Sequence, residues 1–125
     1  MGMRPIRAAG PLMVTFKPSV RMHRLTPALH RMLDVLFTVD GSLPWLPTDL
    51  VVTSINDSHH GMGSRHYTDE AIDVRSHSFA SLADRYAFRR LLIERLGESF
   101  TVLLEDEGQS NEHFHVQVRK GTTFP

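Results

Sequence analysis

The C-terminal part of the chain contains the stretch HFHVQV, residues 113–118. In a β-strand, alternate side chains point to the same face. One set of alternate residues is apolar and predicts a buried face: Phe114, Val116 and Val118. The other set contains His113 and His115, whose imidazoles would lie side by side on the opposite face of the strand. Taken alone, this pattern favours a half-exposed strand with incidental histidines, because a His-x-His motif is short.

A second stretch, SRHYTDEAIDV, covers residues 64–74. If Ile72 and Val74 are buried, Asp73 points to the other face of its strand. An uninterrupted strand would place His66 and Asp73 on opposite faces, so a bend within residues 67–70 is needed for both to reach one ion. The alternative interpretation is a solvated Asp73 and a His66 that is only a loop residue.

The two stretches together favour a metal site. His66, Asp73 and His115 are ligand types of catalytic zinc, which takes three protein ligands and keeps a fourth position for water. Two neutral imidazoles and one carboxylate leave positive charge on the ion, which lowers the pKa of bound water. The sequence has no cysteine, so thiolate sites, disulfides and a cysteine nucleophile are excluded.

The rest of the sequence predicts one α+β domain, a small antiparallel sheet packed against two helices, with residues 1–10 as a loose arm. We expect strands over residues 12–16, 50–55, 71–75, 100–105 and 113–118. Helices are expected over residues 26–37 and 81–96, where Thr26 and Ser81 are the N-caps. Residues 56–70 read as a long functional loop. In the second helix, five side chains are expected to face the core: Leu82, Tyr86, Leu91, Leu92 and Leu96.

Composition and charge exclude some classes of function. The 125 residues are 41% hydrophobic, and 14 basic side chains balance 14 acidic ones. There is no basic excess, so nucleic acid is not expected as the main partner. The apolar run over residues 11–16 is too short for a signal-peptide core or a membrane span. The oligomeric state stays open.

Residues 64–73 resemble the S-x-H-x-x-G-x-A-x-D signature of zinc D-Ala-D-Ala carboxypeptidases and related peptidoglycan peptidases. The same fold includes murein endopeptidases, phage L-alanyl-D-glutamate endolysins and the signalling domain of Hedgehog. Four residues match the signature: Ser64, His66, Ala71 and Asp73. The second signature of the family, E-x-x-H or H-x-H near the C-terminus, is matched by residues 112–115. The resemblance covers roughly residues 50–118.

The resemblance implies a Hedgehog/D-Ala-D-Ala peptidase-like fold and a role for each matched residue. Zn²⁺ would be bound by His66, Asp73 and His115. Glu112 would be the general base that activates water and then protonates the leaving amine. Its alternative interpretation is a surface turn carboxylate, as for Glu105. His113 would stabilise the oxyanion.

Substrate binding is less well defined by the sequence. Ser64 and Arg65 are the residues expected to contact substrate. Many family members place an Arg after a Thr-Ser strand end, but no Arg follows Ser54 here, so Arg65 or Arg75 would have to substitute. Asp69 occupies the position of the signature glycine, and Asp tolerates the backbone angles of glycine better than most residues do.

The function implied is a zinc metallopeptidase, a carboxypeptidase or endopeptidase that hydrolyses peptidoglycan stem peptides. A non-catalytic zinc-containing binding or structural domain of the same fold is the alternative, and an α+β domain without metal is the third hypothesis. No export signal is visible, so we expect synthesis in the cytoplasm and delivery to the cell wall by phage lysis or virion machinery.

Overall fold

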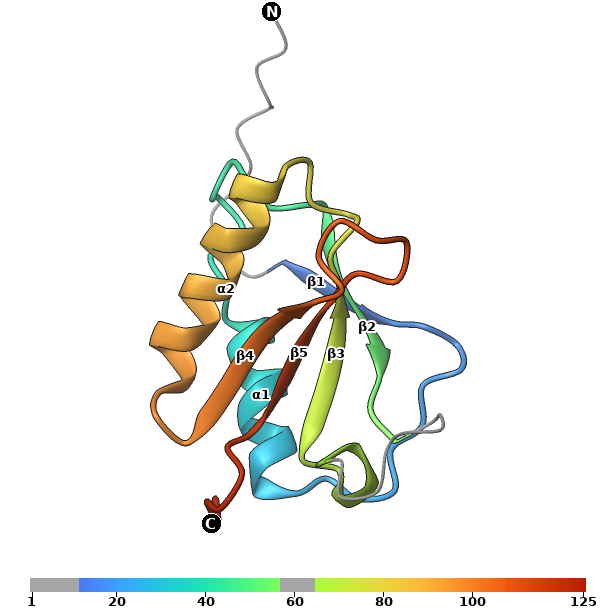
Figure 1. The fold of residues 1–125 in the computed structure, drawn as a ribbon, viewed down its shortest axis with the longest axis vertical. Helices are drawn as coiled ribbons and strands as arrows, with labels where there is room; N and C mark the ends of the chain where they lie inside the picture. Colours follow the sequence, from blue (N-terminus) through green and yellow to red (C-terminus); the bar gives the residue numbers. More distant parts are fainter. Residues whose placement is uncertain (1–11, 57–64) are drawn as a thin grey trace, which may run out of the picture.

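The computed structural model describes residues 12–56 and 65–125, apart from the side chains of His66 and Tyr67. Five strands, two α-helices and one 3-10 helix, η1, follow one another along the chain (Figure 1). Their bounds are β1 (Met13–Phe16), α1 (Pro27–Phe37), β2 (Asp49–Ser54), η1 (Arg65–Thr68), β3 (Ala71–Arg75), α2 (Leu82–Leu96), β4 (Phe100–Glu105) and β5 (His113–Val118). The expected α+β class is confirmed.

The strands form one sheet in the order β1-β2-β3-β5-β4. The sheet is mixed, so the expected small antiparallel sheet is found in three of the four strand pairs and is wrong for the pair of β1 and β2. β1 pairs with β2 in parallel, while the other pairs are antiparallel. The reason is the connection: α1 lies between β1 and β2 in the chain, and a helical crossover returns the second strand in the same direction.

Both helices begin at the caps that the sequence indicates. The hydroxyl of Thr26 accepts a hydrogen bond from the backbone N–H of Leu29 at 3.1 Å, and Pro27 occupies the first turn of α1. The hydroxyl of Ser81 accepts in the same way from Asp84 at 3.1 Å. These side chains satisfy N–H groups that have no partner within the helix.

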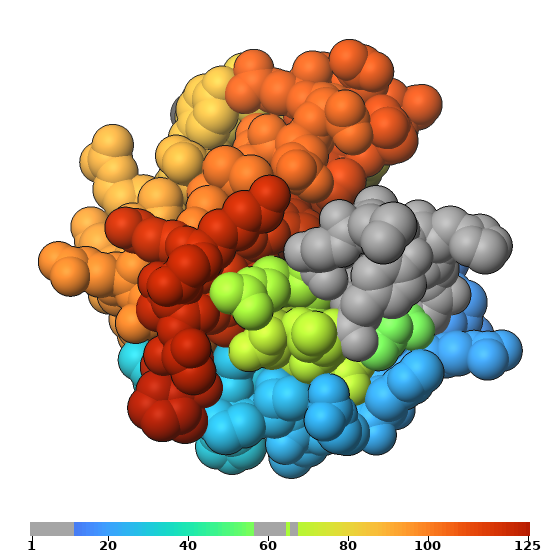
Figure 2. Space-filling model, turned by 60° about the horizontal axis from the view of Figure 1, so that its bottom comes forward, coloured from blue at the N-terminus to red at the C-terminus, as the bar shows by residue number. Residues whose placement is uncertain are grey.

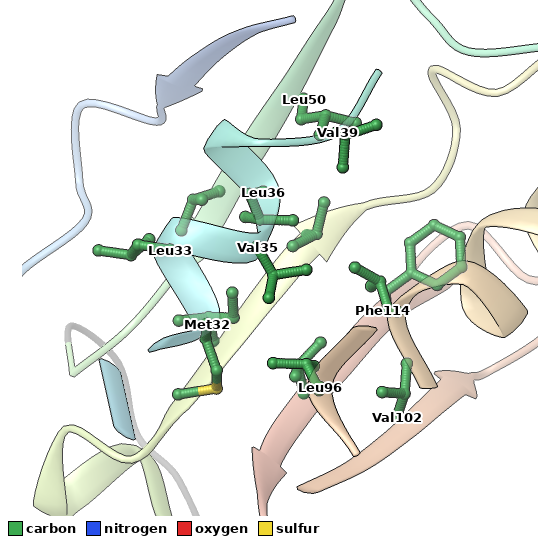
Figure 3. Packing of buried hydrophobic residues seen from close by; sticks show 14 of the residues in the cluster. Met32, Leu33, Val35, Leu36, Val39, Leu50, Leu96, Val102 and Phe114 are labelled. Atoms are coloured by element: carbon green, nitrogen blue, oxygen red, sulfur yellow. The ribbon is translucent and has the colours of Figure 1, made fainter. Parts of the chain in front are cut away.

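The core lies between the two helices and one face of the sheet. α1 contributes side chains such as Met32 and Leu36, which meet Phe114 of β5 and Val102 of β4 in one apolar cluster (Figure 3). Both α-helices therefore cover the same sheet face, and the second face carries no α-helix in the described part of the chain (Figure 1). Packing on one face only explains the apolar–polar alternation of β3 and β5.

The buried stripe of α2 differs from the expected one. Its buried residues are Phe88, Leu92 and Leu96, spaced four apart, whereas Leu82 and Tyr86 are 40% and 47% exposed. A helix buries one stripe, and the aromatic Phe88 selects it because its ring packs in tilted and edge-to-face contacts against the buried rings of Phe79 and Phe114. None of the helices in the described part of the chain is long and apolar enough to cross a membrane.

The turn into β3 is held by Asp69. This residue has a positive φ of 54° and is 1% exposed. Its carboxylate accepts hydrogen bonds from the backbone N–H of Arg24 at 2.6 Å and from the side-chain amide of Asn56 at 2.8 Å. Together with η1, this turn supplies the bend that was expected within residues 67–70.

Candidate metal centre

The sheet face opposite α1 and α2, called the open face below, carries the polar residues of β3, β5 and β4. In these strands the core side chains, such as Ile72 and Val74, are almost fully buried, so their neighbours point to the open face. The strand register arranges the open-face residues in three rows across the sheet: Arg75, His113 and Glu105; Asp73, His115 and Leu103; Ala71, Gln117 and Thr101. Each histidine of β5 therefore has one acidic row partner: His115 lies beside Asp73 of β3, and His113 lies beside Glu105 of β4.

His115 is bound on both of its ring nitrogens. Its Nδ1 atom lies 2.9 Å from Oδ1 of Asp73, and its Nε2 atom lies 2.7 Å from Oε1 of Gln117. Burial lowers the pKa of His115, but the hydrogen bonds to Asp73 and Gln117 and the negative charges of Asp73 and Glu105 outweigh it, so the pKa is raised above its ordinary value. The buried imidazole is thus held by two hydrogen bonds at a position where the electrostatic potential is negative.

His113 forms a second pair in the neighbouring row. Its Nε2 atom lies 3.0 Å from Oε1 of Glu105, and its Nδ1 atom faces the backbone carbonyl of Asn111 at 2.9 Å. The same Nε2 atom is 3.8 Å from Oδ1 of Asp73. Glu105 also approaches His115, with 3.9 Å between Oε1 and Nδ1. The two imidazole–carboxylate pairs are therefore in contact with each other.

Asp73, His113 and His115 are placed so that they could hold a metal ion. One potential ligand atom from each of them lies within 4.8 Å of the others. In both histidines, the ring nitrogen that points away from the group can donate a proton to an oxygen, of Asn111 or Gln117. Such outer hydrogen bonds orient metal-binding histidines and leave the other nitrogen free to ligate. The donor set of nitrogen and carboxylate oxygen fits zinc, among other divalent transition metals.

Glu112, expected as the general base, is placed elsewhere. It lies in the turn before β5 as expected, but its fully buried carboxylate is bound by the Ser76 hydroxyl at 2.6 Å and the Gly108 N–H at 2.9 Å, with the Arg85 guanidinium 3.3 Å away. Burial raises the pKa of Glu112, but these two hydrogen bonds and the Arg85 charge outweigh it and lower the pKa. Among the described residues, this carboxylate joins a cluster at the start of α2 instead of the two histidines.

The remaining predicted site residues lie around η1. Ser64 lies outside the described residues. His66 belongs to η1, which packs against β3 and β5 next to the site, but its side chain is outside the described part. Arg65 pairs with Glu70 at 3.0 Å and donates to the backbone carbonyl of Thr122 at 3.1 Å. Figure 2 shows the C-terminal residues, in red, against the yellow-green segment of η1 and β3. Arg65 therefore has a structural role in holding the C-terminal segment.

Glu105 is the site residue that the sequence interpretation missed. The sequence places it at the end of the strand expected over residues 100–105 and suggests only a surface turn carboxylate. The alternation of side chains in β4 could have indicated its position, because Phe100 and Val102 are buried whereas Leu103 is exposed. Continuing this alternation places Glu105 on the open face, directly opposite His113.

Comparison of the chain with protein-family models, with curated proteins and with solved structures finds no match. The resemblance to zinc peptidases therefore stays a prediction from its two short motifs, and the geometry of the open face has to be interpreted on its own chemistry.

Proposed function

We propose that the open sheet face is the active site of a zinc-dependent peptidase. The observation that carries the proposal is the contact between two imidazole–carboxylate pairs, His115 with Asp73 and His113 with Glu105, on a face that neither α-helix of the described chain covers. Adjacent carboxylates and imidazoles outside a core are the groups that metal-assisted hydrolysis requires.

In this proposal, Asp73 and His115 hold the ion together with a second imidazole. The resemblance assigns that third position to His66, which leaves His113 to Glu105, its nearest partner at 3.0 Å. His113 is the alternative ligand, because it lies within 4.8 Å of the other two groups. A zinc ion bound by these residues would supply a Lewis acid that polarises a carbonyl group and makes water more acidic.

Glu105 replaces Glu112 as the proposed general base. Its Oε1 atom lies 3.0 Å from His113 and 3.9 Å from His115, and its side chain is 41% exposed, so it can reach both water and substrate. Glu105 would take one proton from the attacking water and deliver it to the leaving amine as the amide C–N bond breaks. His113 would stabilise the oxygen that becomes negative through a hydrogen bond from Nε2, in a ring protonated on both nitrogens because Nδ1 faces the Asn111 carbonyl at 2.9 Å.

The proposed substrate is a peptide of bacterial cell walls, a class taken from the resemblance of residues 64–73 and 112–115. A non-catalytic zinc domain is the competing hypothesis, and it predicts the same metal content without turnover.

The test is the release of new amino groups from purified cell walls by the zinc-loaded protein. We expect release by the wild type and a loss of about 100-fold or more in Glu105→Gln, which keeps the shape of the side chain but cannot accept the proton. Glu98→Gln is the matched control, because Glu98 is exposed in the loop between α2 and β4. Wild-type protein that binds zinc but releases no amines, while a phage endolysin does so on the same walls, would overturn the peptidase and leave the zinc domain.

A further inference from the structure

The 3-10 helix η1 contains one of the proposed metal ligands but is too short to hold its own position. It comprises four residues, of which His66 is the second, and it packs against β3 and β5. A 3-10 helix has poor hydrogen-bond geometry, so the place of such a short one depends on the contacts around it. Any group that fixes η1 therefore also fixes the backbone from which His66 would reach the ion.

Tertiary contacts anchor the η1 segment on both sides of His66. On its C-terminal side, the Asp69 carbonyl accepts a hydrogen bond from the Thr26 hydroxyl at 2.7 Å, and the Asp69 carboxylate accepts one from the Arg24 N–H at 2.6 Å. On its N-terminal side, the anchor is the side chain of Arg65. His66 thus lies between two fixed points, and Arg65 is its immediate neighbour in the chain.

The guanidinium of Arg65 joins η1 to the end of β5 and to the residues that follow it. Its Nη1 atom lies 3.0 Å from Oε1 of Glu70, whose backbone carbonyl accepts a hydrogen bond from the Val118 N–H at 3.1 Å. Its Nη2 atom donates to the carbonyl oxygens of Thr122 at 3.1 Å and Arg119 at 3.4 Å. The side chains of Arg65 and Glu70 are only 24% and 20% exposed, so water screens this ion pair less than one on the surface.

The C-terminal segment, residues 119–125, is itself anchored on the sheet. The Arg119 N–H donates to the Ser99 carbonyl at 2.8 Å, and the Thr122 N–H donates to the Arg119 carbonyl at 3.0 Å. The ring of Phe124 packs against the buried ring of Phe100 in β4, with 5.0 Å between the ring centroids. Figure 2 shows this segment, in red, against the yellow-green segment of η1 and β3. The guanidinium therefore ties η1 to a segment that the core holds in place.

We propose that Arg65 is a positioning residue of the metal centre, which acts through η1 to hold His66 at the third ligand position. The inference rests on the proposed function, since it uses the ligand set of Asp73, His115 and His66. Strand pairing aligns Asp73 with His115, whereas His66 lies in η1 and depends on its anchors. Arg65 contributes no ligand atom in this role. Residues that orient a metal ligand from outside typically change metal affinity by about 10- to 100-fold when they are replaced.

The test measures metal binding by Arg65→Gln and Arg65→Lys. The zinc Kd is obtained by competition with a chelator of known affinity, and the visible absorption bands of Co²⁺ bound in place of zinc report the ligand set. We expect Arg65→Gln to bind zinc about tenfold or more weakly and to alter the cobalt spectrum, because a loosened η1 misaligns one ligand. Arg65→Lys should keep part of the affinity, because an ammonium group supplies the charge without the fork geometry.

A second variant leaves Arg65 in place and weakens the anchor of the segment that it binds. Phe124→Ala removes the ring contact with Phe100. It should raise the zinc Kd in the same direction by a smaller factor, and it decides the proposal if Arg65→Gln does not fold. Unchanged zinc binding by Phe124→Ala would then count against the positioning role.

Arg31→Gln is the matched control. Arg31 also donates to a backbone carbonyl, that of Arg95 at 2.7 Å, and approaches the carboxylate of Asp34 at 4.0 Å, but it joins α1 to α2 on the opposite side of the sheet. Its replacement should at most lower the Tm, with the zinc Kd and the cobalt spectrum as in the wild type. A loss of zinc affinity equal to that of Arg65→Gln would mean that general destabilisation explains both variants.

The outcomes separate this inference from the function on which it rests. A zinc-loaded wild type together with wild-type zinc Kd and cobalt spectrum in Arg65→Gln overturns the positioning role alone. A raised KM for cell-wall peptides in that variant would return Arg65 to the substrate contact expected from the sequence. Wild-type protein that binds no zinc overturns the proposed function, and the positioning role with it.

Discussion

Asp73 and His115 are direct partners across β3 and β5, with Oδ1 of Asp73 2.9 Å from Nδ1 of His115. The amide oxygen of Gln117 lies at the other ring nitrogen, 2.7 Å from Nε2. When Nε2–H donates to that oxygen in the neutral ring, the lone pair of Nδ1 points to the same space as the carboxylate. A metal ion that binds there displaces a proton, so its affinity should fall as the pH decreases.

The first prediction concerns the ligands. Zinc content, measured by elemental mass spectrometry on untagged protein, should be about one ion per chain in the wild type and close to zero in Asp73→Ala and His115→Ala, because each removes one of three ligands. His66→Ala should also lose the ion, and His113→Ala should keep it.

The reverse result, in which His113→Ala contains no zinc and His66→Ala contains one zinc ion per chain, would assign the third ligand position to His113. It would contradict the ligand set implied by the resemblance. Exposed His77, which hydrogen-bonds the Ser110 carbonyl outside the site, is the matched control. His77→Ala should bind zinc as the wild type does.

The second prediction concerns stability. Zinc that binds only the folded chain stabilises it by mass action, by about 2.7 kcal/mol at a free concentration one hundred times Kd. For a domain of this size, that shift corresponds to a rise in Tm of roughly 6–15 °C. Differential scanning calorimetry with zinc and then with a chelator measures it. A chelator that leaves the Tm of zinc-treated protein unchanged, or a rise that persists in His115→Ala, would argue against binding at this site.

The third prediction separates the two glutamates. Since the pKa of Glu112 is lowered in the folded state, its contribution to stability is complete above the ordinary pKa of a glutamate and is lost as the pH falls through the lower folded value. Glu112→Gln should therefore reduce the acid-dependent part of the Tm profile, at a cost of about 1–3 kcal/mol near neutral pH. Glu105→Gln should change stability little, because Glu105 is partly exposed.

Turnover should show the opposite pattern, with Glu105→Gln inactive and Glu112→Gln active wherever it remains folded. The check is a Tm series from pH about 3 to about 7 combined with amine release. A Glu112→Gln variant that melts like the wild type but has lost all turnover would restore Glu112 as the general base.

Local patterns predicted the strands of the site well. The alternation in residues 113–118 correctly separated the buried Phe114 from the open-face His115, and the alternation around Asp73 did the same for β3. These predictions succeed because one face of the sheet is packed and the other is open, so a single-residue shift in register would expose the core.

The direction of turns and the pairing of strands were not predictable in the same way. Glu112 and Glu105 both flank the turn between β4 and β5, and the sequence alone did not indicate which carboxylate reaches the histidines. Only the tertiary contact of Glu112 with Ser76 and Arg85 decides it. The parallel pairing of β1 likewise depends on the path of α1 across the sheet, which no local pattern encodes.

The last prediction concerns Asp69, whose φ of 54° lies in the left-handed region that favours glycine. Asp69→Gly keeps this backbone but loses the hydrogen bonds to Arg24 and Asn56, whereas Asp69→Ala loses the bonds and also strains the backbone. We expect Asp69→Ala to cost about 2–4 kcal/mol of unfolding free energy in urea titrations, Asp69→Gly about 1 kcal/mol less than that, and Asp69→Asn the least, because Asn retains an acceptor and tolerates positive φ. Equal stability of the Gly and Ala variants would show that the backbone conformation contributes nothing and that the carboxylate bonds alone hold the turn.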